Sequence, residues 1–412
     1  SKKHLQEFKI MKYIIFIIDG AADYPVKELD GKTPLMVANK PNIDSLAQKG
    51  KCGLFRTIPE NFNTGSAVAN LSILGYDPLV HFHGRGVLEA AAMGIEIEND
   101  DVAFRCNTLC VQDDKLKNHS AGHISNEEGS KLIKAVDSEL GNDKIKFYPG
   151  VSYRHLLVLK DEYSEKVKCI PPHDHPGEKV KELFPKPSSK KGEKTSTLLT
   201  NLMLSSKKTL ENHPVNIERV KQGKDPANII WPWSPGRKPN MKTFQELYNL
   251  KGATISAVDL IKGIGIYAGF DVIHVEGATG LYDTNYEGKA DACIKALENY
   301  DLVYVHVEAP DEASHEGNVQ LKVKCIEDFD RRLLSRALSK LNRRDDIKLA
   351  ILPDHPTPVK VRTHVSDPVP FLIYSPCYEG DDVTEFNELS VKNGSYGFVE
   401  RDEFISKFLL SN

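Results

Sequence analysis

The feature that most constrains the fold is a run of apolar, β-branched residues that leads into acidic and imidazole side chains. Residues 301–317 read DLVYVHVEAPDEASHEG, in which 301–307 predict a buried strand and Pro310 ends the pattern. Asp311 and His315 follow, where α/β proteins place their sites just past a parallel strand. Asp and neutral His suit Zn²⁺, Mn²⁺ or Mg²⁺. Taken alone, the segment fits a metal site and a solvated polar loop equally.

Two further apolar runs end in the same way. Residues 13–18 (YIIFII) lack alternation, as expected of a central strand covered on both faces, and Asp19 follows them. Residues 347–352 (IKLAIL) are followed, after one proline, by Asp354 and His355. Asp19 alone would fit a turn-capping residue before a glycine.

Apolar segments alternate between strand and helix patterns in the first and last parts of the chain. This alternation predicts an α/β fold with a mostly parallel sheet flanked by helices. Besides the three strands above, strands are predicted over 271–275 and 369–374. Helices are predicted over 33–50, 67–75, 256–269, 287–299 and 318–344.

The middle of the chain has a different texture, with dense Lys and Glu and clustered prolines. Alternating segments such as 153–159 indicate a separate, smaller α+β domain. We expect a discontinuous core of residues 1–85 and 246–412, interrupted by an insert of residues 86–245. Residues 223–237 (GKDPANIIWPWSPGR) hold both tryptophans and predict a binding loop, with aromatic packing over a turn as the alternative.

Composition excludes several classes of protein. The 412 residues carry a formal charge of −4, which gives no electrostatic reason to expect nucleic acid or an anionic membrane as a partner. The seven cysteines form no CxxC pair and fit a reducing, cytoplasmic setting. No apolar run reaches the length of a membrane span. Residues 1–10 lack a signal-peptide pattern, and we treat them as neutral for the fold.

Ser66 lies at a predicted loop-to-helix junction, directly after the sequence NFNTG. Unpaired backbone N–H groups and the helix dipole favour an anion at such a junction. Ser66 could be an N-cap and nothing more. It could also be a nucleophile whose alkoxide is stabilised by metal.

The carboxyl ends of neighbouring parallel strands share one edge of a sheet, so the polar residues after the three strands should converge. Burying several carboxylates together is costly by mutual repulsion unless cations neutralise them. The number of ligands suits two metal ions, which at about 3.5–4 Å apart support phosphoryl transfer. The expected cluster comprises Asp19, Asp311, His315, Asp354, His355 and His364.

The ordered motifs resemble those of the alkaline phosphatase superfamily and, within it, the archaeal-type 2,3-bisphosphoglycerate-independent phosphoglycerate mutases. The more specific segments are residues 65–78, 84–90 and 252–263, and the resemblance covers nearly the whole chain from Met11. It implies an alkaline-phosphatase-like fold. The superfamily motifs are Asp19-Gly20, Thr64-Gly65-Ser66, Asp311-x-x-x-His315-x-Gly317, Asp354-His355 and His364-x-x-x-Pro368.

The resemblance also implies a reaction, that of an isomerase of glycolysis and gluconeogenesis. Ser66 would take the phosphoryl group from 3-phosphoglycerate and return it to the other hydroxyl of the retained glycerate, without 2,3-bisphosphoglycerate. Because glycerate must stay bound and turn around, the insert would close over the site. One metal ion would be held by Asp19, Ser66, Asp354 and His355, and the other by Asp311, His315 and His364.

The identity of the metal and the substrate contacts follow less directly. Mn²⁺ is favoured for the two ions, while Zn²⁺, Mg²⁺ and Co²⁺ remain open. In related mutases a His, several Arg residues and a Lys hold the substrate, and Arg suits carboxylate and phosphate through its bidentate fork. An ordinary surface ion pair is the alternative for each Arg. The candidates in this chain are His123, Arg154, Arg237, Lys262, Arg85 and Arg105.

Two other functions compete with the mutase. A metal-dependent phosphatase or phosphonate hydrolase on the same scaffold would differ only by admitting water. A non-catalytic carbohydrate-binding or metabolite-binding protein would have no use for Ser66 or for the full ligand set. In each case the partner is a small molecule, and the oligomeric state stays open.

Overall fold

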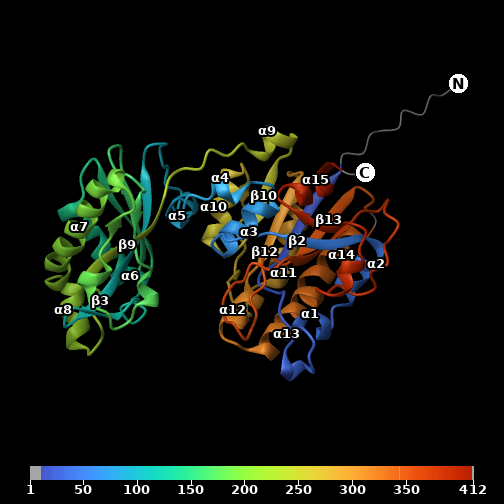
Figure 1. Ribbon diagram of the computed structural model, residues 1–412, viewed down its shortest axis with the longest axis horizontal. Helices are drawn as coiled ribbons and strands as arrows, with labels where there is room; N and C mark the ends of the chain where they lie inside the picture. Colours follow the sequence, from blue (N-terminus) through green and yellow to red (C-terminus); the bar gives the residue numbers. More distant parts are fainter. Residues whose placement is uncertain (1–10, 343, 411–412) are drawn as a thin grey trace. The chain divides into compact units, whose positions relative to one another are not determined.

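The computed structural model describes residues 11–342 and 344–410. The expectation for residues 1–10 therefore lies outside the described residues. The chain forms two compact units, which we call the core unit (Ser1–Phe82 with Met241–Asn412) and the insert unit (His83–Asn240) (Figure 1). The sequence prediction places the core at residues 1–85 and 246–412 and the insert at residues 86–245. No helix within the described ranges is long and apolar enough to cross a membrane.

The core unit is built on an eight-stranded sheet with the order β11-β10-β12-β1-β13-β14-β2-β15. The pairs from β11 to β13 are parallel, as is β15 with β2, whereas β14 runs antiparallel to both neighbours. The predicted mostly parallel α/β sheet is confirmed. The strands are β1 (Lys12–Ile18), β2 (Lys51–Arg56), β10 (Gly252–Ile255), β11 (Asp271–Val272), β12 (Leu302–Val307), β13 (Ile347–Leu352), β14 (Val369–Tyr374) and β15 (Gly397–Glu400).

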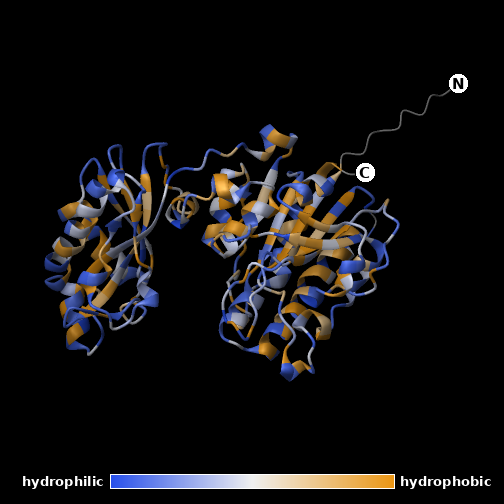
Figure 2. Cartoon of the chain, in the orientation of Figure 1, coloured by the Kyte–Doolittle hydropathy of each residue, from blue (hydrophilic) through white to orange (hydrophobic). Residues whose placement is uncertain are grey.

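Helices flank this sheet, and hydrophobic residues concentrate along the strands (Figure 2). Residues 14–18 of β1 and all of β12 and β13 are buried, as expected of strands covered on both faces. The helices are α1 (Pro34–Val37), α2 (Pro41–Lys49), α3 (Ser66–Ile73), α4 (Pro78–His81), α9 (Phe244–Tyr248), α10 (Asp259–Tyr267), α11 (Tyr286–Ala296), α12 (Ala309–His315), α13 (Val319–Asp328), α14 (Ser335–Leu341) and α15 (Glu403–Leu410).

Several helix boundaries differ from the sequence prediction for local reasons. The helix predicted over 33–50 is two helices, because Pro41 starts a new one and cannot continue the first. The helix predicted from residue 256 starts at Asp259, since the preceding Gly252–Ile255 joins the sheet as β10. In the predicted helix 318–344, a π-helical segment, Phe329–Leu334, joins α13 to α14.

The insert unit is an α+β structure in which β3 pairs antiparallel with β4, β6 and β9, and β6 pairs with β5. A short ribbon of β7 and β8 lies outside this sheet. Its strands are β3 (Val102–Gln112), β4 (Lys115–Asn118), β5 (Ile145–Val151), β6 (Arg154–Leu159), β7 (Val167–Lys168), β8 (Lys186–Pro187) and β9 (Ile229–Gly236). Its helices are α5 (Arg85–Ala92), α6 (Asn126–Leu140), α7 (Glu193–Glu211) and α8 (Pro214–Lys221).

The predicted tryptophan-bearing binding loop is wrong, because most of it is strand β9. Trp231 and Trp233 are buried in the core of the insert unit. Their indole N–H groups donate to Ile170 O at 2.8 Å and to Asn107 Oδ1 at 3.1 Å. The prolines that suggested a loop are accommodated in β9, and the tryptophans pack in the core from this strand and not over a turn.

A buried lysine ties together two loops that lead to the sheet edge. Lys322 on α13 is fully buried, and its ammonium donates to Asp23 Oδ2 at 2.8 Å, Thr357 O at 3.0 Å and Ala22 O at 3.2 Å. These acceptors lie in the loops after β1 and β13. The three contacts use all three ammonium hydrogens, so the loops are fixed to α13 and to each other.

Replacing this lysine should destabilise the core unit strongly. Lys322→Met leaves the Asp23 carboxylate buried without its cation, and we expect a loss of about 3–5 kcal/mol in the free energy of unfolding. Lys340→Met is the matched control, because it removes an exposed ion pair with Asp291 and should cost about 1 kcal/mol or less. Chemical unfolding followed by circular dichroism measures both. Equal losses would contradict the role assigned to Lys322.

Candidate active site

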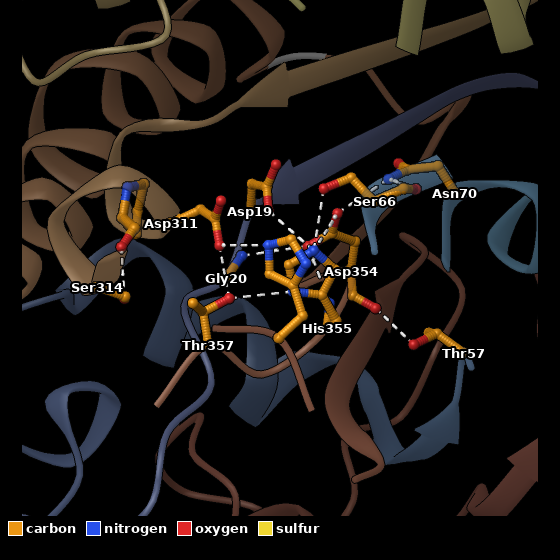
Figure 3. A network of polar contacts seen from close by, with 12 residues as sticks. Asp19, Gly20, Thr57, Ser66, Asn70, Asp311, Ser314, Asp354, His355 and Thr357 are labelled. Atoms are coloured by element: carbon orange, nitrogen blue, oxygen red, sulfur yellow. Dashed lines mark hydrogen bonds and ion pairs between the residues drawn. The ribbon is translucent and has the colours of Figure 1, made fainter. Parts of the chain in front are cut away.

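The site is organised by three adjacent strands, β12, β1 and β13, whose carboxyl ends lie together. Asp19 follows β1, Asp354 and His355 follow β13, and Asp311 lies in α12 just beyond β12. The predicted convergence is therefore present in the folded chain. Figure 3 shows these side chains and Ser66 gathered around a common region.

Asp19 and two residues after β13 form the first candidate metal group. Ligand atoms of Asp19, Asp354 and His355 all lie within 4.8 Å of one another, and all three residues are buried. Asp19 Oδ2 meets His306 Nε2 at 2.8 Å, whereas Asp19 Oδ1 is buried without a hydrogen-bond partner. An unpartnered buried carboxylate oxygen is costly, and a cation would satisfy it.

A second candidate group joins α12 to the loop after β13. Ligand atoms of Asp311, His355 and His364 lie within 4.8 Å of one another. His315 Nε2 lies 3.1 Å from Asp311 Oδ2 and 3.1 Å from His364 Nε2. The Asp311 carboxylate and the imidazoles of His315 and His364 therefore lie close together. Asp19, Glu308 and Asp311 form a third candidate group, which shares residues with the other two.

Hydrogen bonds at the far side of two rings fix their tautomers. The Thr357 hydroxyl donates to Asp311 Oδ1 at 2.5 Å, so at 3.1 Å it can only accept from His355 Nδ1–H. The Arg362 carbonyl accepts from His315 Nδ1–H at 2.9 Å. The Nδ1–H of each ring is therefore engaged outside the cluster, which leaves Nε2 as the atom available to a metal ion. The hydrogen bond with Asp311 raises the pKa of His315 to about 9, so a metal ion bound there would replace the proton on Nε2.

Electrostatics also favour positive charge at this position. Burial, followed by repulsion from Asp354 and Asp311, raises the pKa of Asp19 well above its usual value. Burial and repulsion from Glu312 and Asp311 raise the pKa of Glu308 to about 8. The buried oxygens, the tautomers and this mutual repulsion all fit divalent cations, so the described residues suit the metal that the resemblance implied.

Ser66 is the first residue of α3, and the N-cap of this helix is Gly65. The N-cap interpretation is therefore wrong. Ser66 Oγ lies 3.0 Å from His355 Nε2, within the cluster (Figure 3). The helix N-terminus at Ser66 favours negative charge on this oxygen and on a phosphate beside it.

Sequence reasoning missed several residues that hold the cluster in place. Asn70 Nδ2 donates to Ser66 O at 2.8 Å and to Asp354 Oδ2 at 2.9 Å, and the Tyr304 hydroxyl donates to Asn70 Oδ1. Nothing in the sequence pairs these positions. Glu308 did carry a signal, because it is a carboxylate at the carboxyl end of a predicted strand.

The six substrate candidates lie in different units. Lys262 belongs to the core unit, on α10, where its ammonium lies 3.3 Å from Asp259 Oδ1. The others belong to the insert unit: His123, Arg85, Arg105, Arg154 and Arg237.

Within the insert unit, two candidates share one aromatic side chain. The ring of His123 lies 6.3 Å from that of Tyr153, and the Arg154 guanidinium lies 5.6 Å from the same ring. The Arg105 guanidinium lies 4.3 Å from the Trp233 ring, and its Nε is 3.1 Å from Glu89 Oε1.

The two remaining arginines are Arg85 and Arg237. Burial, and then repulsion from Arg105, lowers the pKa of Arg85. The Arg237 guanidinium donates to Glu165 Oε2 at 2.6 Å, Asp100 O at 2.7 Å and Tyr163 O at 2.9 Å. These contacts hold the end of β9 against neighbouring loops of the insert unit, a structural role that the sequence did not suggest.

Fold and site together define a class, that of α/β proteins with a carboxylate and imidazole cluster beside a serine at the carboxyl edge of the sheet. A family model described as 2,3-bisphosphoglycerate-independent phosphoglycerate mutase matches residues 47–216. A protein of that name from Methanosarcina acetivorans is 53% identical over 397 residues, which cover 96% of this chain and 98% of the relative. Another, from Methanothermobacter thermautotrophicus, is 49% identical and covers 95% of each chain.

Solved structures agree. A protein from Pyrococcus horikoshii superposes with a TM-score of 0.82 at 31% identity, covering 97% of this chain and 96% of the other. The cofactor-independent phosphoglycerate mutase from Thermoplasma acidophilum gives a TM-score of 0.69 at 28% identity, covering 98% of this chain and 100% of the other. The chain belongs to the family of archaeal-type 2,3-bisphosphoglycerate-independent phosphoglycerate mutases, and the resemblance seen in the sequence is confirmed.

A glycine at the cluster gives a test of its geometry. Gly20 has φ +65°, and a Cβ there would lie 2.6 Å from Asp311 Oδ1 and 2.8 Å from Asp311 Cα. Gly20→Ala should therefore displace Asp311 and weaken divalent-metal binding at least about tenfold. Gly31→Ala is the matched control, since Gly31 has φ +76° with nothing within 4 Å of the added Cβ.

Both substitutions should cost about 1–2 kcal/mol of stability from backbone strain. Only Gly20→Ala should also lose metal affinity, measured by titration calorimetry with Mn²⁺. Equal affinities in the two variants would show that Asp311 does not need its present position.

Proposed function

We propose that this chain interconverts 3-phosphoglycerate and 2-phosphoglycerate through a phosphoserine at Ser66, without 2,3-bisphosphoglycerate. The observation that carries the proposal is the Ser66 hydroxyl, 3.0 Å from His355 Nε2 in a cluster suited to divalent metal. Membership of the mutase family supports the choice of substrate.

In the first step, Ser66 Oγ attacks phosphorus as the bond between phosphorus and the substrate oxygen breaks. The Ser66 hydroxyl loses its proton, the leaving oxygen of glycerate gains one to become an alcohol, and the phosphoryl group stays on Ser66. Glycerate then turns within the site, and its other hydroxyl attacks the phosphoserine and loses a proton as the bond between phosphorus and Ser66 Oγ breaks and Ser66 regains a proton. The N-terminus of α3 supports the negative charge on the phosphoryl oxygens in both steps.

We assign one ion to Asp19, Ser66, Asp354 and His355, and the other to Asp311, His315 and His364. Divalent ions bound there would stabilise the Ser66 alkoxide and neutralise the phosphoryl group. Mixed carboxylate and imidazole ligation suits Mn²⁺, which we favour over Zn²⁺, Mg²⁺ and Co²⁺.

We assign the substrate to residues of the insert unit, which would act as a lid that excludes water. His123 and Arg154 flank Tyr153 and are the first candidates to hold the glycerate carboxylate. Arg85 and Arg105 form a second basic pair, and Lys262 of the core unit would meet the phosphate. Arg237 remains a prediction, with its guanidinium engaged in structural contacts.

The seven cysteines, all in the described part of the chain, are free thiols. A chain with this many thiols and no disulfide suits a reducing compartment, so we place the enzyme in the cytoplasm.

Removing the nucleophile should abolish the reaction. Ser66→Ala should reduce the formation of 2-phosphoglycerate from 3-phosphoglycerate by about 10³-fold or more, because no covalent acceptor remains. The assay contains Mn²⁺ and no bisphosphoglycerate, and free phosphate is followed alongside 2-phosphoglycerate. Ser339→Ala, an exposed serine of α14, is the control and should keep full activity.

The two products separate the possible outcomes. Formation of 2-phosphoglycerate by the unmodified enzyme, lost in Ser66→Ala, supports the mutase. Free phosphate as the main product would make the protein a phosphatase of the same scaffold. Activity retained in Ser66→Ala would rule out the phosphoserine.

Removing the metal should abolish activity and lower thermal stability. A chelator should eliminate turnover, and Mn²⁺ at about 100 times its Kd should restore it while adding about 2.7 kcal/mol to the stability. Asp19→Asn keeps an acceptor for His306 but removes the charge, so its melting temperature should respond less to Mn²⁺, because only the ion at Asp311, His315 and His364 is still held fully. A full Mn²⁺ response in Asp19→Asn would contradict the assignment of Asp19 as a ligand.

A further inference from the structure

A histidine in the buried strand β12 contacts the cluster through Asp19. His306 is the fifth residue of β12 and is fully buried. Its Nε2 lies 2.8 Å from Asp19 Oδ2, and its Nδ1 lies 3.1 Å from the Ser256 hydroxyl. None of the candidate metal groups includes His306. Its ring therefore supports a ligand and is not itself one.

The hydrogen bonds around Ser256 define the direction of proton donation. The backbone N–H of Val258 donates to Ser256 Oγ at 3.0 Å, which leaves the serine hydroxyl hydrogen available to donate to His306 Nδ1. His306 then carries its proton on Nε2 and donates it to Asp19. The distance of 2.8 Å between Asp19 Oδ2 and His306 Nε2 also requires a proton on Nε2. The contacts at both ring nitrogens therefore indicate the same tautomer.

The backbone of His306 is fixed as well. The buried Lys289 ammonium donates to His306 O at 2.9 Å, at the carboxyl end of β12. Ring and carbonyl are thus both held, and the ring has little freedom to rotate away from Asp19.

The consequence appears at the two oxygens of Asp19. Oδ2 is occupied by His306, whereas Oδ1 has no partner and lies 3.5 Å from His355 Nε2. One oxygen is anchored, and the other is left free toward Asp354 and His355. A carboxylate that is held on one side before metal arrives loses less conformational freedom on binding.

We propose that Ser256 and His306 are positioning residues that fix Asp19 and thereby set the metal affinity of the group formed by Asp19, Asp354 and His355. The inference rests on the proposed metal occupancy of this group, but not on the identity of the substrate. It extends the site to strand β12 and to the segment that leads into α10.

The test measures the affinity of the metal-free protein for Mn²⁺ by titration calorimetry, without substrate. His306→Leu removes the donor at similar size, and we expect about 10- to 100-fold weaker binding of one ion. His306→Gln can still direct an N–H toward Asp19 and should recover most of the affinity. Ser256→Ala keeps the ring but frees its tautomer, so it should weaken binding by a smaller, measurable factor.

A buried histidine of the insert unit supplies the matched control. His155 on β6 is as buried as His306, with partners Thr108 and the Gly150 N–H. His155→Leu should reduce thermal stability without changing Mn²⁺ affinity. The melting temperature of each metal-free variant is recorded, because a merely structural role would change it without changing the affinity.

Wild-type affinity in His306→Leu, or in Ser256→Ala if His306→Leu fails to fold, would overturn the inference. Equal weakening in His306→Leu and His306→Gln would also overturn it, because packing and not donation would then be the cause. Failure of the mutase assay by the unmodified enzyme would refute the proposed function while leaving these affinities interpretable.

Discussion

The structure depends on one electrostatic constraint, the gathering of buried carboxylates at the carboxyl edge of a sheet. Asp19, Asp311 and Asp354 follow or adjoin adjacent strands, and each is at most a few per cent exposed. Their mutual repulsion is a cost that the fold accepts, because hydrophobic burial along β12, β1 and β13 holds the strands together. Cations bound at this edge would relieve the repulsion, and this relief would favour their binding.

Many neighbouring contacts prepare the cluster for those cations. Thr357 and Arg362 hold the Nδ1 atoms of two imidazoles whose Nε2 atoms lie in the cluster, and Asn70 links Ser66 to Asp354. Lys322 fastens the loops after β1 and β13 to one helix. The site therefore owes its geometry to ordinary hydrogen bonds of the core unit.

The sequence predicted the sheet and the cluster because both depend on local patterns. A buried strand has a continuous apolar run, and a parallel sheet brings the residues after Ile18, Val307 and Leu352 to one edge. The supporting contacts could not be predicted in this way. The contact between Tyr304 and Asn70 joins residues 234 positions apart, and β9 was hidden because its prolines resemble those of a loop.

The most direct test of the central claim is anomalous diffraction from crystals grown with Mn²⁺. The account predicts two peaks at the edge of the core sheet, one contacted by Asp19, Asp354 and His355 and the other by Asp311, His315 and His364. A single peak, or peaks away from these residues, would contradict the claim that the carboxylate cluster is built for two cations.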